Sequence, residues 1–241
     1  MKLEFLGVGN FFTKQDYHNN LLVNDHILVD CGYTAGRSLA DSNRSFADID
    51  TLFITHTHAD HIGGLEECAF FNKYVKGGPK PKLYLPNALI PDLWENSLKG
   101  GLYDAVSGAT GLEDYFDLHP VADNFSADQI QFDLIPTNHV QNKFCCGLLL
   151  GNKVYYSGDT QFDRNMILAN GSHSDVEAIF HDVQFFQAGV HTPMDDLLTL
   201  PPEIRQKTWL MHYSDDYEQH TRRASDAGFR WAKSHSPYIF S

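Results

Sequence analysis

The chain has 241 residues, of which 42% are hydrophobic, and its formal net charge is −13. This length and apolar content predict one large core, and therefore a single domain over residues 1–241. Only 18 lysines and arginines stand against 31 acidic residues. Binding to long RNA or DNA needs a basic stripe, which this sequence lacks, whereas a single nucleotide is compatible because divalent ions can bind its phosphate.

Short apolar or β-branched runs predict the strands of this chain. In order they are 2–6, 21–23, 27–29, 51–55, 82–85, 130–135, 146–150, 154–157, 178–180 and 208–211. Helices are expected at 38–41, 62–75, 90–98 and 219–233. Because helices lie between groups of strands, the pattern predicts the α/β class, with two packed sheets and helices outside.

One segment, residues 99–114, has four glycines and no clear hydrophobic period. We expect a mobile insertion there, which is either a lid over a functional site or an ordinary surface loop.

The compartment of the protein can also be inferred from composition. No apolar run is long enough to span a bilayer, and the first residues have the pattern of a strand, not of a signal peptide. The four cysteines show no Cys-x-x-Cys spacing, which disfavours a cysteine-rich zinc site and fits a reducing compartment. We therefore expect a cytoplasmic protein that does not associate with membranes.

Three histidines and an aspartate follow the predicted strand at 51–55. They are His56, His58, Asp60 and His61. Burying four such groups without partners would be costly, whereas imidazoles and carboxylates suit zinc, iron or manganese. His56 and His58 are two positions apart and can chelate one ion, while Asp60 and His61 can reach a second. The alternative, a polar loop with chance histidines, is disfavoured by this density.

Other predicted strands also end in histidine or aspartate. These residues are His139, Asp159, His181 with Asp182, and His212, and His191 follows in the sequence Gly-Val-His-Thr-Pro. A single strand-terminal histidine is usually structural. Because several strand ends repeat the pattern, we expect them to converge on one site.

The order His56-x-His58-x-Asp60-His61, then His139, Asp159 and His212, resembles the metallo-β-lactamase superfamily over most of the chain. The resemblance implies an αββα sandwich with two divalent metal ions at one edge, zinc, with manganese as the alternative. The ligands that it implies are His56, His58 and His139 for one ion, Asp60, His61 and His212 for the other, and Asp159 as a bridge.

The branch of the superfamily follows from further residues. Zinc β-lactamases usually carry cysteine where this chain has Asp159, so antibiotic hydrolysis is disfavoured. His181-Asp182 and His191-Thr192 resemble the acid–histidine segments of the tRNase Z and cyclic-phosphodiesterase branch, with Asp182 in place of glutamate. Asp159 follows His139 by only 20 positions (159 − 139), which leaves no room for the tRNA-binding arm of bacterial tRNase Z. The chain is most similar to anti-Pycsar cyclic nucleotide phosphodiesterases.

This resemblance implies hydrolysis of 3′,5′-cyclic mononucleotides to linear monophosphates, which would counter cyclic-nucleotide-based antiviral signalling. Asp60, Asp182 and His191 are the catalytic candidates, with His191 protonating the leaving oxygen. We expect little discrimination among bases, because no Arg or Asn/Gln cluster is placed to read a base edge, so that stacking would be the main contact. The resemblance also implies a homodimer, located in the host cytoplasm if a phage encodes it.

Three other functions stay open at this stage. A glyoxalase II-like thioesterase shares the seven-ligand pattern, and a tRNase Z-like tRNA 3′-processing endonuclease shares the branch. A metal-containing protein that sequesters a signal is the third, but it would need no general acid, so the pair formed by Asp182 and His191 disfavours it.

Overall fold

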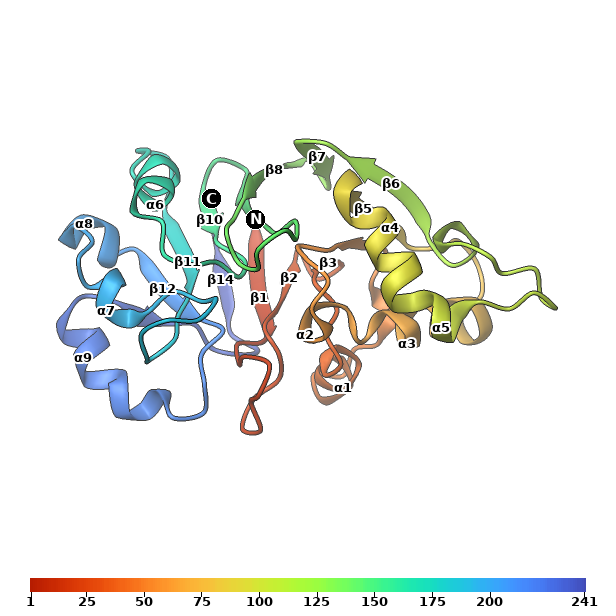
Figure 1. Cartoon of the computed structure of the whole chain (residues 1–241), viewed down its shortest axis with the longest axis horizontal. Coiled ribbons are helices and arrows are strands. Elements are labelled where there is room, and N and C mark those ends of the chain that lie inside the picture. Colours follow the sequence, from red (N-terminus) through yellow and green to blue (C-terminus); the bar gives the residue numbers. More distant parts are fainter. The chain divides into compact units, whose positions relative to one another are not determined.

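The computed structural model describes all 241 residues, which divide into two compact units. Unit 1 comprises Met1–Gly7, Tyr17–Ala122 and His235–Ile239, and unit 2 comprises Val8–Asp16, Asp123–Ser234 and Phe240–Ser241. Each unit contains one seven-stranded sheet, so the prediction of an α/β chain with two sheets is confirmed (Figure 1). The single domain over 1–241 stays a prediction. No helix combines the length and apolarity needed to cross a bilayer.

The sheet of unit 1 is mixed. Its strands, in sheet order, are β14 (Pro237–Ile239), β1 (Lys2–Gly7), β2 (Asn20–Val23), β3 (Ile27–Val29), β4 (Thr51–Phe53), β5 (Lys82–Pro86) and β6 (Asp117–Val121). β14, β1, β2 and β3 pair antiparallel, and β3 to β6 pair parallel. Every residue of β2, β3 and β4 is buried. Burial on both faces explains why these strands are mainly apolar, with Asn20 and Thr51 as the polar exceptions at the starts of β2 and β4.

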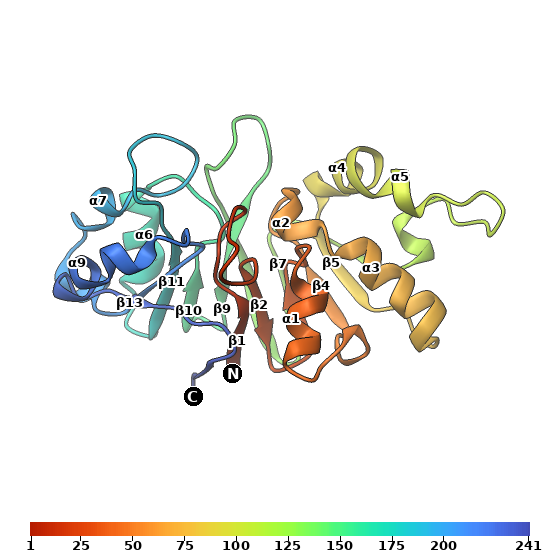
Figure 2. The ribbon, with the colours of Figure 1, turned by 90° about the horizontal axis from the view of Figure 1, so that it is seen from below.

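The helices of unit 1 are short. They are α1 (Ala35–Asp41), η1 (Phe46–Asp48), α2 (Ala59–Ile62), α3 (Leu65–Phe70), η2 (Phe71–Lys76), η3 (Asn87–Leu89), α4 (Ile90–Leu93), η4 (Trp94–Leu98), α5 (Lys99–Leu102) and η5 (Leu112–Asp114). In Figure 2, α3 lies beside β5, whereas α5 lies farther from β5, beyond α4. The helix predicted at 62–75 starts earlier and breaks at Gly63-Gly64, where a Cβ on Gly64 would lie 2.5 Å from the Gly32 carbonyl oxygen.

The segment 99–114 is more ordered than the sequence suggested. Its first four residues form α5, and Leu102, Ala109 and Leu112 are buried. The glycines therefore do not make the whole segment irregular, because apolar residues between them pack inward. Whether it covers a functional site stays a prediction.

The sheet of unit 2 is also mixed. Its strands, in sheet order, are β13 (Arg230–Trp231), β12 (Thr208–Met211), β11 (Ala178–Asp182), β10 (Val154–Tyr156), β9 (Cys146–Leu150), β8 (Ile130–Pro136) and β7 (Asn124–Ala127). β10 to β13 pair parallel, and the other pairs are antiparallel. The carboxyl ends of β10, β11 and β12 therefore meet at one edge, which brings together the polar residues that follow them.

The helices of unit 2 are α6 (Arg164–Gly171), α7 (Met194–Leu197), α8 (Pro202–Arg205), η6 (Tyr217–His220) and α9 (Thr221–Asp226). Figures 1 and 2 show α7 and α9 on the side of the sheet that carries β11 and β12. The C-terminal helix predicted at 219–233 is wrong beyond Asp226. Gly228 takes a φ of +95°, which ends the helix, and β13 then pairs with β12.

One ion pair in unit 1 gives a test of stability against pH. Arg44 donates two hydrogen bonds to Glu4, at 2.6 and 3.0 Å, and these bonds hold the pKa of Glu4 below its ordinary value of 4.5. The pair stabilises the fold fully above that value, and the stabilisation is lost as the pH falls through the lowered pKa. We expect Arg44→Met to reduce the free energy of unfolding by about 1–3 kcal/mol near neutral pH. Urea unfolding should show this difference shrinking in acid, and an undiminished difference would contradict the assignment.

Candidate metal centre

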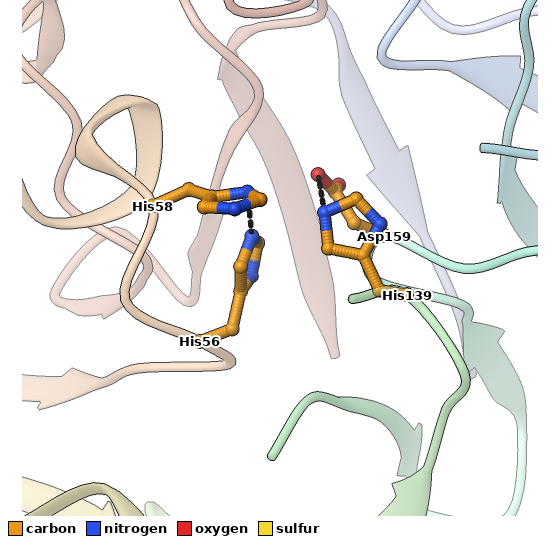
Figure 3. Close-up of side chains that lie close together, drawn as sticks. All are labelled: His56, His58, His139 and Asp159. Atoms are coloured by element: carbon orange, nitrogen blue, oxygen red, sulfur yellow. Dashed lines mark hydrogen bonds and ion pairs between the residues drawn. The ribbon is translucent and has the colours of Figure 1, made fainter. Parts of the chain in front are cut away.

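Unit 1 carries the predicted donors that follow β4. His56, Asp60 and His61 are at most 2% exposed, and His58 is half-buried. His56 Nε2 lies 3.1 Å from His58 Nδ1 (Figure 3), and His61 Nε2 lies 3.4 Å from Asp60 Oδ2. The extended backbone at His58 and the short helix α2 place each pair of donor atoms within 4.8 Å, as the sequence spacing predicts.

Asp30 is a site residue that the sequence reasoning missed. It follows β3 with a φ of 64°, is fully buried, and accepts hydrogen bonds from the Thr55 N–H at 2.8 Å and from His61 Nδ1 at 2.8 Å. Burial raises the pKa of Asp30, and the His61 imidazole opposes that shift. This contact orients the His61 ring and occupies its Nδ1 atom, so Nε2 is the nitrogen that can bind a metal ion. The available signal is an aspartate that directly follows the predicted strand at 27–29.

The backbone packs so closely around Gly32 that no side chain can be accommodated at this position. A Cβ there would lie 1.9 Å from the Asp60 carbonyl oxygen. We therefore expect Gly32→Ala to lower the free energy of unfolding by about 1–3 kcal/mol and to weaken metal binding by displacing Asp60. Gly100→Ala is the control, because a Cβ at Gly100 meets nothing within 4 Å. Thermal unfolding and metal content of the two variants check this, and equal behaviour would refute it.

Unit 2 carries the other predicted donors: His139 after β8, Asp159 after β10 and His212 after β12, each 2% exposed. Asp159 Oδ2 lies 3.7 Å from His139 Nε2 (Figure 3) and 3.4 Å from His212 Nε2. His139 Nδ1 donates to the Val190 carbonyl oxygen at 2.8 Å. Burial lowers the pKa of His139, which favours the neutral imidazole that binds metals.

Asp182 and His191 meet in unit 2 although nine positions separate them. His191 Nδ1 lies 2.9 Å from Asp182 Oδ2, and the Thr160 N–H donates to the same oxygen at 3.2 Å. Burial alone would raise the pKa of Asp182, but hydrogen bonds from His181 and His191 lower it to about 2. Asp182 is therefore ionised and fixes the orientation of His191. The His191 side chain is 22% exposed, so it remains accessible.

His181 has a different environment from the other strand-terminal histidines. Its side chain is buried, and its Nδ1 lies 2.9 Å from the Asp182 carbonyl oxygen and 3.3 Å from Asp182 Oδ1. It therefore supports Asp182 from inside the fold. His191 is also close to a predicted ligand, because its Nδ1 lies 3.9 Å from Asp159 Oδ2.

The donor chemistry of both units fits divalent metal ions. The donors are imidazole nitrogens and carboxylate oxygens, which suit zinc or manganese. In His61 and His139, Nδ1 contacts an oxygen, a carboxylate in one case and a backbone carbonyl in the other. Metal-binding histidines commonly make this second contact, because it fixes the tautomer that presents Nε2 to the ion.

Known proteins are similar to this chain over most of its length. A family model described as "Anti-Pycsar protein Apyc1" matches residues 1–237. The Anti-Pycsar protein Apyc1 of Paenibacillus harenae is 38% identical over 232 residues, which cover 92% of this chain and 94% of the relative. The protein of the same name from Bacillus phage BSP38 is 41% identical over 234 residues, which cover 90% of each chain.

A solved structure confirms the fold. The metallo-β-lactamase fold protein YhfI from Bacillus subtilis matches with a TM-score of 0.72 at 16% identity, over 98% of each chain. The chain therefore has the metallo-β-lactamase fold, as its sequence predicted.

Proposed function

This chain belongs to the Anti-Pycsar protein Apyc1 family, and from that premise we propose that it is a metal-dependent phosphodiesterase. Its substrates would be 3′,5′-cyclic mononucleotides, which it would hydrolyse to linear monophosphates. The observation that carries the proposal is the pair formed by Asp182 and His191, whose His191 ring also lies 3.9 Å from Asp159. An oriented histidine beside a predicted metal ligand is suited to proton transfer at a phosphodiester.

We propose that the donors of the two units bind two divalent ions together. The assigned ligands are His56, His58 and His139 for one ion, Asp60, His61 and His212 for the other, and Asp159 for both. When bound, the ions would supply a nucleophilic water at neutral pH and offset the charge of the phosphate. Zinc is the first choice for this donor set, and manganese is the alternative.

The remaining roles concern proton transfer and the orientation of the attacking water. His191 would donate the proton that the leaving ribose oxygen needs, from its Nε2 atom. Asp182 would hold the Nδ1 proton of His191 and stabilise the positive charge that the ring carries before it donates. Asp60 would combine metal binding with orientation of the attacking water.

The size and charge of the substrate follow from general features of the chain. A cyclic mononucleotide carries one negative charge, which two divalent ions can offset, whereas the net charge of −13 opposes a long polyanion. Between His139 and Asp159 lie β9 and β10, so that interval contains no long arm that could bind tRNA. Relatives carry the name Anti-Pycsar protein Apyc1. We propose that this chain counters a cyclic-nucleotide signal, and that it does so as a homodimer in the cytoplasm.

A panel of substrates tests this function. The metal-loaded protein is incubated with cyclic AMP, GMP, CMP and UMP, with a precursor tRNA and with a thioester, and the products are separated by chromatography. We expect linear monophosphates from the cyclic nucleotides. Cleavage of the tRNA 3′ trailer or of the thioester, without turnover of any cyclic nucleotide, would replace the proposal by the corresponding alternative.

A further inference from the structure

A cavity of ≈ 490 Å³ in unit 2 lies directly against His139. Four carboxamide side chains line it, from Asn138, Gln141, Asn142 and Gln161. Binding sites for small molecules commonly have volumes in this range. Since His139 is one of the assigned metal ligands, a group bound in this cavity would lie next to the reacting phosphate.

The wall of the cavity is a tight turn that follows His139. The Lys143 N–H donates to the Val140 carbonyl oxygen at 3.2 Å, and Asn142 takes a φ of 63° at the tip. Gln161 ties the turn to the segment after β10. Its N–H donates to the Asn138 carbonyl oxygen at 2.6 Å, and its Nε2 donates to the His139 carbonyl oxygen at 3.4 Å. The turn is thus anchored to the backbone of the assigned ligand.

The chemistry of the lining is unusual for this chain. The protein has 31 acidic residues, yet none of them lines the cavity, and Lys143 is its only lysine or arginine. A carboxamide offers both an N–H donor and a carbonyl acceptor, so it can pair with the hydrogen-bonding edge of a purine or a pyrimidine. The lining therefore suits a neutral, planar group with donors and acceptors that is attached to an anion.

We propose that this cavity binds the nucleobase of the substrate, and that Gln141 and Asn142 hydrogen-bond its edge. The inference rests on the proposed function, since it places the cyclic phosphate at the metal centre beside His139. The sequence-based expectation that no Asn/Gln cluster lies together is wrong, since four carboxamides line this cavity. Little discrimination among bases stays a prediction. Asn138, Gln141 and Asn142 lie within five positions of the sequence, and the fold adds Gln161 to them.

The test compares substrates with and without a base. The variant Gln141→Ala/Asn142→Gly removes both carboxamides, and glycine at 142 keeps the backbone conformation of positive φ. We expect KM for cyclic AMP to rise about tenfold, with kcat little changed, since each hydrogen bond contributes about 0.5–1.5 kcal/mol. The inhibition constant of a base-free analogue, methyl ribofuranoside 3′,5′-cyclic phosphate, should stay unchanged.

Controls separate the possible outcomes. Gln206→Ala removes an exposed glutamine after α8 and should change neither constant, and melting temperatures check that all variants fold. An unchanged KM for cyclic AMP in the double variant would overturn the inference, and so would an equal loss for the base-free analogue. Failure of the proposed function has a different signature, because the unaltered protein would then hydrolyse no cyclic nucleotide.

Discussion

Replacement of Asp159 by alanine is expected to abolish hydrolysis and to release both metal ions. The Asp159 carboxylate lies 3.7 Å from His139 Nε2 and 3.4 Å from His212 Nε2, so it is shared by the two ligand sets that we assign. Without it, each ion loses a charged ligand and the attacking water loses its position. We expect turnover to fall by about 10⁶-fold or more, toward the uncatalysed rate.

His212→Ala is the matched comparison for this variant, because His212 is assigned to one ion only. Elemental analysis of the purified proteins should therefore show a larger loss of metal for Asp159→Ala than for His212→Ala. Thermal unfolding shows whether each variant is folded. If Asp159→Ala retained the metal content of the unaltered protein, its assignment as the shared ligand would be wrong.

His191→Ala separates the chemical step from metal binding. His191 Nδ1 forms a hydrogen bond with Asp182 Oδ2 at 2.9 Å. We assign His191 to protonation of the leaving oxygen and not to metal binding. We expect the variant to keep both ions and to lose about 10²–10⁴-fold in kcat, the usual contribution of a positioned acid. Asp182→Asn should show a smaller loss, because the amide oxygen can still accept the Nδ1 proton while the negative charge is gone.

The control for this experiment is His173→Ala, which removes an exposed histidine elsewhere in unit 2. It should leave both kcat and metal content unchanged. If His191→Ala lost metal, His191 would be a metal ligand and not a general acid. If the variant kept full activity, His191 would have no role in catalysis.

The sequence predicted the central strands of both sheets because their residues are buried. In β3, β4 and β10 every residue is buried, so each strand consists mainly of apolar and aromatic residues, with Thr51 of β4 as the exception. The edge strands were not predicted: β14 has three residues and β13 has two, and both carry exposed or polar side chains. Their pairing depends on partners far away in the sequence, which local patterns do not record.

The candidate ligands were predictable for a topological reason. His139, Asp159 and His212 each follow a strand of one sheet, and a polar residue at a strand end is conspicuous in an apolar run. Residues that act through long-range contacts were missed. Asp30 contacts His61 across 31 positions, a distance that local sequence patterns do not record.

Titration of metal into metal-free protein tests the central claim most directly. The protein is stripped with a chelator, zinc or manganese is added in known equivalents, and hydrolysis of cyclic AMP is followed at each step. The assignment of seven ligands to two ions predicts no activity without metal, and a rise that levels off at two equivalents per chain. Full activity in the metal-free protein, or a plateau at one equivalent, would contradict it.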